Sequence, residues 1–550
     1  MAPADPGAGT GPSTVWTEEL RAWRAALEAG EPLATTAGGE ALAALVDLAL
    51  HGEQASRATA AGESLRLLGL SPSHEPQHQA FDLLVQLGRF APDENLHLLR
   101  DRVPQQFATS LLAEAARLAT REPWAAASRV DLGDLPTVTI DDPETSEVDD
   151  ALSAAPGPGG SHLVWVHIAD PGAFLPPDSA LRREAGRRAA TLYLPDRKIT
   201  MLPPVLAEGP ASLAEGQPRA ALTLQARISP EGRILEQRFL VSRIQVDRRL
   251  SYEEADRLQE ERGPLGDLLH RLQEAAYALE EARREQGALL LNRPEVRVRR
   301  LADGRIRLQP VDPYSPSRSL VAELMILVGT CAARLFMREG IPAIYRVQDP
   351  PTEPCRIPEG PHDAATAYAV LRRLHRAELS RIPRRHAGLG VEPYVQITSP
   401  IRRYGDLLLQ EQLRGWLLEG RPRYREEELL DRLGEAEEVA LGLTGIERAS
   451  KRYWTLRYLE GHRGAPVEAQ VLEEIHPGSY LVELRQTCLR GILEAPPGLS
   501  PGTWLTPRLG AVDARRDRLP LRLAETAPLL PPGGSAGAPR SPHHREEKDE

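Results

Sequence analysis

The sequence predicts an α/β (α+β) multidomain protein, with an N-terminal helical domain, a large mixed domain and a C-terminal β-barrel. Three observations predict this class. The first part of the chain is alanine-rich with helical periodicity, the middle alternates apolar strands with long helical stretches, and the last part has short alternating strands between Gly and Pro turns. A chain of 550 residues is long enough for several domains with substantial cores.

The composition is that of a globular protein, with 41% hydrophobic and 26% charged residues. No long apolar run predicts a membrane span, and the first residues lack the features of a secretory signal. Cys331, Cys355 and Cys488 are scattered and odd in number, so a disulfide framework or metal knuckle is not indicated, and a reducing cytoplasm is expected. The net charge of -11 argues against coating of nucleic acid but leaves room for a basic channel.

The ends of the chain, residues 1–16 and 526–550, are rich in Pro, Gly, Ser and charge and are predicted to be disordered. Residues 17–125 have helical periodicity, clearest in EALAALVDLALHG and HQAFDLLVQLGRF, and are predicted to form a compact, winged-helix-like or helix-turn-helix domain. Whether such a domain contacts nucleic acid or only packs against the rest of the protein stays open, because most small helical bundles have no nucleic-acid role.

Residues 126–462 are predicted to form one large mixed domain. The segment SHLVWVHIAD is a nearly continuous apolar strand of the kind that is buried on both faces, and long helical stretches such as SLVAELMILVGTCAARLFMREG follow. Residues 463–525 contain five short alternating segments, which predict an OB-type barrel. The faces of such barrels commonly bind single-stranded nucleic acid.

The segment TVTIDDPETSEVDDALSA concentrates acidic side chains after a short predicted strand. Asp141 ends the strand, and Glu147, Asp149 and Asp150 follow a run of turn-forming residues. Hard divalent cations such as Mg²⁺ need oxygen ligands of this sort, and metal pairs activate water in phosphodiester cleavage. A solvated acidic loop with helix-capping roles is an equal alternative. An EF-hand is disfavoured because its central glycine and closing glutamate are missing.

Two further segments indicate contact with a phosphate chain. In QITSPIRRYGDLLLQ, Arg402 and Arg403 open an apolar helix, where cations oppose the helix dipole unless an anion binds there. A surface pair with nearby acids is an equal alternative. In ATLYLPDRKITMLPP, Tyr193 lies between prolines, where its ring can stack on a base, although core packing is favoured for this segment alone.

Taken in order, six segments resemble the catalytic domain of the ribonuclease II / ribonuclease R (RNB) exoribonucleases. The resemblance covers roughly residues 130–460, and the C-terminal barrel matches the family's usual ending. Classical members begin with cold-shock-type barrels, so the helical N-terminal region resembles a bacterial branch with a helix-turn-helix domain there. The segments are TIDDPETSEVDDALSA, VHIADPGAFLPPDSAL, LYLPDRKITMLPP, SLVAELMILVGTCAARL, IPAIYRVQDPP and TSPIRRYGDLL.

The resemblance implies a Mg²⁺-dependent enzyme, with Mn²⁺ as a second candidate metal, that digests single-stranded RNA from its 3′ end by processive hydrolysis to nucleoside 5′-monophosphates. It implies Asp149 as the most directly catalytic acid and Arg402 as the arginine at the scissile phosphate. It also implies a cytoplasmic monomer with RNA as partner and no membrane. The implied metal ligands are Asp141, Glu147, Asp149 and Asp150, and the implied RNA-binding residues are Tyr193, Tyr252, Glu323, Arg402, Arg403 and Glu447.

Several residues outside this set have secondary or no expected roles. His167 and Asp170 are expected either to support the site or to serve the strand that carries them. Asp142 and Glu144 fall outside the matched positions and are expected to be solvated loop residues.

The chain also departs from the family pattern. Glu147 replaces the usual aspartate and adds one methylene, against a cation that demands near-ideal geometry. Gln348 and Gln396 stand where the family often has histidine, Gly329 where it often has asparagine, and Leu291 where it has an aromatic residue. These departures leave a catalytically impaired, RNA-binding pseudoenzyme as the alternative. A purely structural protein would leave the acidic segment and TSPIRRY unexplained.

Overall fold

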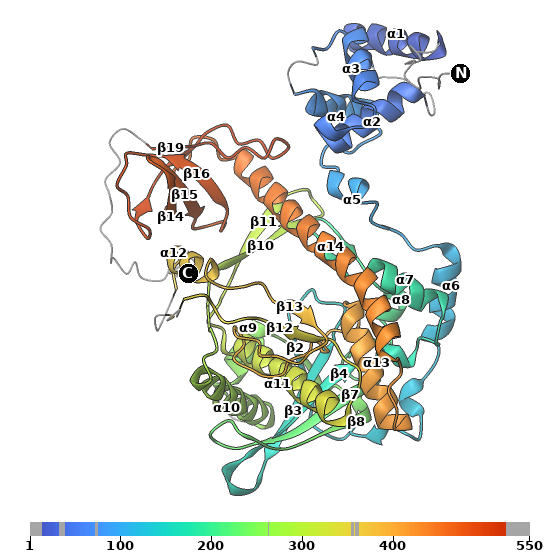
Figure 1. Ribbon diagram of the computed structural model, residues 1–550, viewed down its shortest axis with the longest axis vertical. Helices are drawn as coiled ribbons and strands as arrows, with labels where there is room; N and C mark the ends of the chain where they lie inside the picture. The colour runs from blue at the N-terminus through green and yellow to red at the C-terminus, as the bar shows by residue number, and fades with distance from the viewer. Residues whose placement is uncertain are drawn as a thin grey trace, which may run out of the picture.

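The computed structural model describes residues 14–31, 39–71, 75–261, 263–353, 357 and 362–523. A helical N-terminal part, a large mixed body and a C-terminal sheet lie apart in Figure 1, and the long helix α14 (Glu426–Glu460) runs from the body to the sheet. The predicted multidomain class is confirmed. Helix α1 begins at Thr14, inside the segment predicted to be disordered, and the rest of both predicted disordered ends lies outside the described residues.

The N-terminal helices form their own small core. Leu20, Trp23, Leu45, Leu65 and Phe81 are buried together there. The side chains of α6 instead belong to the core of the body, so residues 17–125 do not all pack as one unit. The helices are α1 (Thr14–Ala29), α2 (Glu40–His51), α3 (Ala58–Leu67), α4 (Pro76–Gln86), α5 (Leu96–Arg100) and α6 (Thr109–Ala119).

The body is built on a seven-stranded sheet with the order β1-β8-β7-β4-β3-β2-β9. Neighbouring strands are antiparallel except for the parallel pairs β1–β8 and β2–β9. The apolar strand predicted at SHLVWVHIAD is β4, near the middle of the sheet, where six consecutive residues are buried. The strands are β1 (Val130–Asp131), β2 (Val138–Asp141), β3 (Asp150–Pro156), β4 (His162–Ala169), β7 (Pro218–Ile228), β8 (Ile234–Gln245) and β9 (Arg248–Ser251).

Helices and short hairpins pack around this sheet. Helix α10 contacts β3, β4 and α11, and α13 contacts β8 and α14. Their apolar faces and the sheet share one large hydrophobic core. The helices are α7 (Ala180–Arg188), α8 (Pro204–Ala207), α9 (Tyr252–Leu258), α10 (Pro264–Glu285), α11 (Pro316–Glu339), α12 (Ala364–Leu371) and α13 (Tyr404–Glu419). The paired short strands are β5 (Leu192–Tyr193) with β6 (Lys198–Ile199), β10 (Glu295–Arg300) with β11 (Ile306–Val311), and β12 (Tyr345–Val347) with β13 (Glu378–Ser380).

Helix α11 is the one helix, within the described part of the chain, that is long and apolar enough to span a membrane by composition. Its most apolar stretch is 72% buried inside the protein. Leu320, Leu324 and Phe336 on this helix lie in the core of the body. The burial is that of a core helix of the body.

The C-terminal sheet has the order β17-β14-β15-β16-β19-β18. The edge strands β17 and β18 follow each other closely in the chain, and a bridge from Pro466 to Arg508 draws β18 toward the start of β14, as in a barrel that is nearly closed. Leu456 and Leu459 of α14 complete its core. The strands are β14 (Ala469–His476), β15 (Ser479–Leu484), β16 (Arg490–Glu494), β17 (Trp504–Leu505), β18 (Arg508–Leu509) and β19 (Leu521–Arg522).

A set of polar contacts, here called the junction, joins the N-terminal helices to the end of α14 and to the β18–β19 connection. Glu75 pairs with Arg516 and Arg518. Asp93 accepts hydrogen bonds from the Tyr453 hydroxyl at 2.7 Å and from Arg457 Nε at 3.0 Å. Most of these side chains are partly exposed, with exposed fractions from 27% to 60% for the charged partners.

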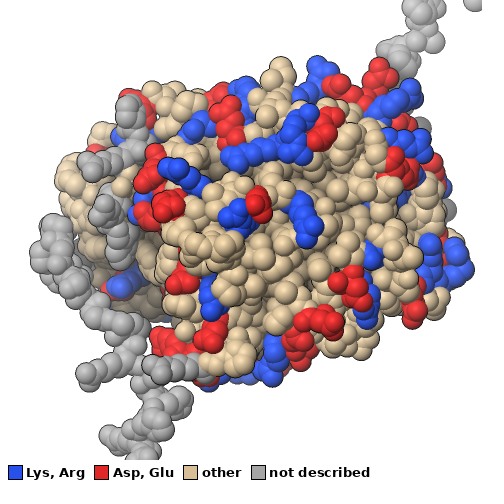
Figure 2. All heavy atoms as spheres, turned by 90° about the horizontal axis from the view of Figure 1, so that it is seen from below, with Lys and Arg blue, Asp and Glu red and all other residues tan. Residues whose placement is uncertain are grey.

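The surface carries both signs of charge. On the face drawn in Figure 2, Lys and Arg side chains alternate with Asp and Glu side chains over a largely uncharged surface. No large field of one sign covers this face, which agrees with the modest net charge of the chain.

Candidate active site

Strand pairing brings the two ends of the acidic segment together. Strand β2 ends at Asp141 and its antiparallel neighbour β3 begins at Asp150, so residues 142–149 loop back between the two strands. This segment is here called the acidic loop. Strands β2 and β3 lie between the middle strand β4 and the edge strand β9, and Glu147, Val148 and Asp149 of the loop are buried. The fold therefore forces carboxylates into a buried position.

Asp149 joins this loop to the segment before α13. Its side chain is only 3% exposed. One carboxylate oxygen accepts a hydrogen bond from the Ile401 backbone N–H at 2.9 Å, and the other lies 3.1 Å from Arg402 Nε. Asp406 fixes the same segment, because it accepts the Ser399 N–H at 2.9 Å and an Arg403 N–H at 2.7 Å. The two halves of the predicted site meet at this point.

Glu147 is held by the β5–β6 hairpin. The Tyr193 hydroxyl donates a hydrogen bond to Glu147 Oε2 at 2.9 Å, and Lys198 Nζ lies 3.9 Å from the same oxygen. The second oxygen, Oε1, is buried and has no hydrogen-bond partner among the described residues. Oδ2 of Asp141 is buried and unpartnered in the same way.

The buried carboxylates have perturbed pKa values. Burial, opposed by Arg402, raises the pKa of Asp149 to about 6. Burial, with the nearby Asp149 and Asp142, raises the pKa of Asp141 to about 7. Burial and the charges of Asp141 and Asp149 hold the pKa of Asp150 well above its usual range. Carboxylates crowded in an interior with too little positive charge favour protonation or a bound cation.

The donor set fits a hard divalent cation, although its arrangement is not that of a loaded site. In the described ranges, no three His, Cys, Asp or Glu side chains converge as they do around a bound metal ion. The unpartnered oxygens of Asp141 and Glu147 are nevertheless the hard oxygen donors that Mg²⁺ takes in proteins. Arg402 holds the carboxylate of Asp149 instead.

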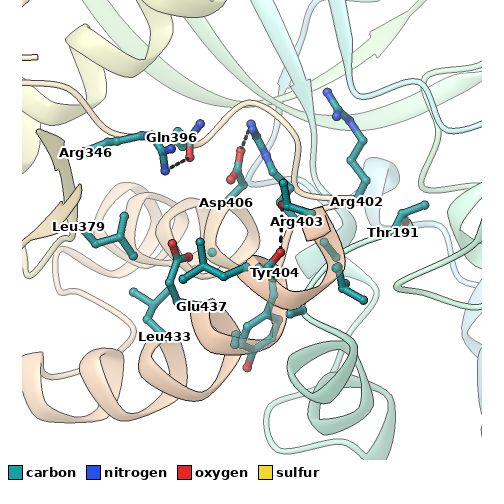
Figure 3. Close-up of a pocket in the computed structure, with 18 of the residues that line it drawn as sticks. Thr191, Arg346, Leu379, Gln396, Arg402, Arg403, Tyr404, Asp406, Leu433 and Glu437 are labelled. Carbon is teal, nitrogen blue, oxygen red and sulfur yellow. Dashed lines mark hydrogen bonds and ion pairs between the residues drawn. The ribbon is translucent and has the colours of Figure 1, made fainter. Parts of the chain in front are cut away.

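A cavity of about 390 Å³ adjoins this cluster. Tyr193, Arg402, Arg403 and Glu447 line it, and the Tyr193 N–H donates to Glu447 Oε1 at 3.0 Å. Figure 3 shows Arg403 turned back to Asp406, while the Arg402 side chain extends away from it. The structure thus gathers four of the six predicted RNA-binding residues around one cavity.

The other two predicted RNA-binding residues lie elsewhere. Tyr252 is the first residue of α9, and the Arg318 guanidinium lies 3.8 Å from the centre of its ring. Burial and the charges of Asp150 and Asp141 raise its pKa, which places the phenol close to the acidic cluster. Glu323 is buried on α11 in a two-point ion pair with Arg283 of α10, with one contact of 2.8 Å. Its role in RNA binding stays a prediction.

The expectation for Asp142 is wrong. Its carboxylate bridges Arg297 of β10 and Arg318 of α11, the latter at 2.9 Å, and it is only 24% exposed. Glu144 is 48% exposed, with Arg299 at 3.4 Å. Asp142 therefore anchors the acidic loop to two other elements rather than to solvent.

The secondary residues have clear structural contacts. His167 lies fully buried in β4 between the hydroxyls of Ser153 and Thr223, at 3.1 and 2.8 Å. Asp170 is buried between Arg129 and Arg414. Both contribute to the sheet beneath the site.

Two departures from the family pattern have packing explanations. A Cβ on Gly329 would lie 2.4 Å from a ring carbon of Tyr394 and from the Val395 carbonyl, so no larger residue fits there. Gln348 donates to the His375 carbonyl at 2.7 Å and accepts the Gly388 N–H at 2.8 Å, which fixes the chain beside β12. Gln396 accepts from Arg346 at 3.3 Å and lines the cavity. Leu291 lies half-buried outside the helices and strands, and nothing in the structure explains its replacement of an aromatic residue.

Sequence analysis missed three residues that shape this centre. Asp406 lies three residues after Arg403 in TSPIRRYGDLL, and Lys198 lies in LYLPDRKITMLPP, so both were within recognised segments. Ser212 is buried beside the acidic loop, where its hydroxyl accepts the Val148 N–H at 2.9 Å and donates to the Ser146 carbonyl at 3.1 Å. No local pattern marks that serine.

Comparison with models of protein families identifies the family of the chain. The RNB domain model matches residues 129–356 and 355–419. The chain belongs to the RNB ribonuclease family. A second model, the Double HTH domain, matches residues 13–96, which confirms the helix-turn-helix character predicted for the N-terminal helices.

Relatives of this RNB chain carry ribonuclease names. An uncharacterized ribonuclease of Synechocystis is 35% identical over 459 residues, covering 80% of this chain and 67% of that protein. The chloroplastic/mitochondrial ribonuclease II of Arabidopsis thaliana is 32% identical, over 72% of this chain and 50% of that protein. Ribonuclease R of Escherichia coli is 30% identical, over 53% of this chain and 40% of that protein. The RNB chain thus spans about half or less of the length of the last two.

Solved structures share the fold. Ribonuclease R of Mycoplasma genitalium, in complex with ribose-methylated single-stranded RNA, superposes with a TM-score of 0.69 at 19% identity, over 78% of this chain and 77% of that one. An active-site mutant of the Dss1 exoribonuclease from Candida glabrata gives a TM-score of 0.79 at 19% identity, over 93% and 70%. Yeast Ssd1, a pseudonuclease, gives 0.56 at 17% identity, over 76% and 56%.

Proposed function

We propose that this RNB chain is a Mg²⁺-dependent exoribonuclease that hydrolyses single-stranded RNA processively from its 3′ end and releases nucleoside 5′-monophosphates. The contact of Asp149 with Arg402 carries the proposal. These residues come from segments 253 positions apart, and their pairing joins the buried carboxylates to the cavity that Arg402, Tyr193 and Glu447 line. A phosphodiester at Arg402 therefore lies against the acidic cluster.

The cation in this proposal is held by Asp141, Glu147, Asp149 and Asp150. The free buried oxygens of Asp141 and Glu147 and the raised pKa values of the aspartates support a bound cation at this cluster. When bound, Mg²⁺ or Mn²⁺ supplies an activated water and stabilises the leaving oxygen. Asp149 would contribute to holding the cation while it also accepts the Ile401 N–H and the Arg402 Nε–H.

The remaining residues orient the RNA. Arg402 uses Nε for Asp149 and its side chain is 42% exposed, so its outer N–H groups are left to bind a phosphate whose charge grows in the transition state. Tyr193 is 44% exposed, so its ring can stack on a base while its hydroxyl holds Glu147. Glu447 fixes the Tyr193 backbone. In this proposal, the three residues hold the last phosphodiester of the RNA beside Arg402.

The proposal includes a monomeric enzyme in a reducing cytoplasm. Cys331 is a buried free thiol and Cys488 is a half-buried one. Burial raises the pKa of the Cys331 thiol to about 12, so that thiol is inert. Cys355 lies outside the described residues.

Time-resolved cleavage tests the proposal. Purified protein is incubated with 5′-labelled single-stranded RNA and Mg²⁺, beside Asp149→Asn and the matched control Asp303→Asn, which alters an exposed carboxylate beside Arg305. The expected result is a collapse to short 5′-labelled products and free 5′-monophosphates for the wild type and Asp303→Asn. The Asp149→Asn variant is expected to lose at least about 100-fold in rate, as when a group acting on the transition state is removed.

The alternative is an RNA-binding pseudoenzyme, favoured by Glu147 at the second acidic position and by Arg402 resting on Asp149. It predicts salt-dependent RNA binding without cleavage in either Mg²⁺ or Mn²⁺. Recovery of cleavage by Glu147→Asp would then identify the defect.

A further inference from the structure

The acidic loop is also fastened by contacts on either side of Glu147. Lys198 Nζ donates to Ser146 Oγ at 2.6 Å and pairs with Glu208, and Ser146 donates to Glu208 at 3.0 Å. Ser212 bridges the backbone on both sides of Glu147. The position of the Glu147 backbone is therefore set before any cation arrives.

The two oxygens of Glu147 have different surroundings. Oε2 accepts the Tyr193 hydroxyl and faces the Lys198 ammonium, whereas Oε1 is buried without a partner in the part of the chain that the structure describes. A positive charge and a hydrogen bond both stabilise the charge on Oε2 and oppose a second cation beside it. Only Oε1 is left to bind a metal ion.

This difference bears on which metal ion binds. Ca²⁺ accepts carboxylates through both oxygens and tolerates variable geometry, whereas Mg²⁺ requires a small octahedral shell with one oxygen from each carboxylate. A glutamate is long enough to turn both oxygens toward an ion, unless one of them is held back.

We propose that Tyr193 and Lys198 hold Glu147 to a single ligating oxygen, Oε1, and so select Mg²⁺ over Ca²⁺ at this centre. The inference rests on the proposed function, because it takes Glu147 as a metal ligand. Lys198 acts through Glu147 and Glu208 and touches no substrate, so it is a positioning residue. The glutamate at the second acidic position then works because its hairpin partners remove the freedom that the extra methylene adds.

Cation binding is measured without RNA on the full chain, stripped of metal by a chelator. The melting temperature is followed against Mg²⁺ and, separately, Ca²⁺, and the concentration giving half the maximal rise reports binding. The variants are Lys198→Met, Lys198→Arg and Tyr193→Phe. The matched control is Lys451→Met, because Lys451 is a partly exposed lysine whose ion-pair partner, Glu295 at 3.6 Å, is not part of the acidic loop.

The wild type is expected to bind Mg²⁺ in preference to Ca²⁺. Lys198→Met and Tyr193→Phe are each expected to shift the ratio of the two half-points toward Ca²⁺ by about tenfold. This lies between the effect of a unit charge about 4 Å away in water and its larger effect at lower dielectric, and it matches the loss of one hydrogen bond to a charged group. Lys198→Arg keeps the positive charge and is expected to keep the wild-type ratio of the two half-points. Lys451→Met is also expected to leave this ratio unchanged. In the Glu147→Gln background, Lys198→Met no longer changes the ratio.

An unchanged ratio in Lys198→Met and Tyr193→Phe overturns the inference while leaving the proposed nuclease intact. An equal shift in the Glu147→Gln background also overturns it, because the effect then bypasses Glu147. If neither cation raises the melting temperature of the wild type, the proposed metal dependence fails, and the inference fails with it. Should Lys198→Met not fold, Tyr193→Phe and Lys198→Arg decide the matter.

Discussion

The acidic loop and the junction both set carboxylates against arginines, but they do so in different surroundings. Around the loop, Asp149 is 3% exposed and its partners come from distant segments of one core. At the junction, Glu75 is 36% exposed and meets Arg516 and Arg518 in contact with water. Exposed pairs are weak and screened by salt, whereas breaking a buried pair leaves an uncompensated charge. The buried pairs around the acidic loop make a rigid site. The exposed pairs of the junction make a contact that salt can weaken.

The charge of the helix-turn-helix region sharpens this contrast. Residues 13–96 contain five arginines, no lysine and twelve Asp or Glu residues. A domain with this balance repels phosphate, which favours the packing role over contact with RNA. Its acidic residues instead meet the arginines of the β18–β19 connection, where the Arg515 guanidinium also lies 4.0 Å from the Phe81 ring centre. The arginines of the β18–β19 connection therefore contact the N-terminal helices of the same chain.

The largest effect is expected on breaking the buried pair of Glu323 with Arg283. Glu323→Ala leaves the guanidinium buried without its acid, and it is expected to lower the stability of the body by about 3–5 kcal/mol in denaturant unfolding. The double variant Arg283→Met, Glu323→Met is expected to lie close to the wild type. A loss below about 1 kcal/mol for the single variant would mean that this pair behaves like the exposed ones.

Loss of the Ser212 hydroxyl is expected to loosen the acidic loop. Ser212→Ala leaves the Val148 N–H buried and unpaired, which costs about 1–3 kcal/mol and speeds hydrogen exchange at Val148. The RNA cleavage rate is expected to fall with it. Ser229→Ala, another buried serine in the β7–β8 turn, serves as control and is expected to lower stability while leaving cleavage unchanged.

The sheet beneath the loop is expected to respond to pH. Burial lowers the pKa of His167 from 6.5 to about 3, so the folded state keeps the ring neutral. The unfolded chain binds a proton below about pH 6.5, so this contribution is complete above that pH and is lost as the pH falls toward 3. The stability difference between the wild type and His167→Gln is expected to shrink by about 1 kcal/mol between pH 7 and 5.5. A constant difference would show that the pKa of His167 is the same in the folded and unfolded states.

The smallest effect on melting temperature is expected at the junction. Glu75→Gln removes one acid shared by two arginines, and the helical part is expected to separate from the C-terminal sheet at lower salt than in the wild type. Energy transfer between dyes on the two parts, followed from about 0.05 M to about 1 M salt, measures this change. Glu28→Gln, which removes an ion pair within α1, is the control and is expected to change nothing. Salt-independent energy transfer in the wild type would show that screened ion pairs do not hold the junction together.

The sequence predicts the parts of this protein that local patterns encode. The apolar run of β4 identifies a buried strand, and paired arginines at the start of an apolar helix indicate an anion site in TSPIRRYGDLL. The role of Arg402 beside the acidic segment came from the family resemblance and not from a local pattern. The ion pairs of Asp142 could not be predicted from local patterns, because its arginine partners lie 155 and 176 residues away on other elements. The ion pair of Glu323 was missed for the same reason, since Arg283 lies on another helix. The packing of α6 with the body likewise depends on tertiary contacts, because its own periodicity fits either domain.

Helix α14 runs between the surroundings of the acidic loop and the junction. Glu447 reaches the cavity from this helix, and Leu456 and Leu459 on the same helix lie in the core of the C-terminal sheet. At 1.5 Å per residue, Glu447 and Leu456 are about 14 Å apart along one continuous hydrogen-bonded rod. The helix is therefore a rigid connection between the C-terminal sheet and the cavity. A tilt of the C-terminal sheet would be transmitted along it to Glu447 and, through the hydrogen bond from the Tyr193 N–H, to the backbone of Tyr193.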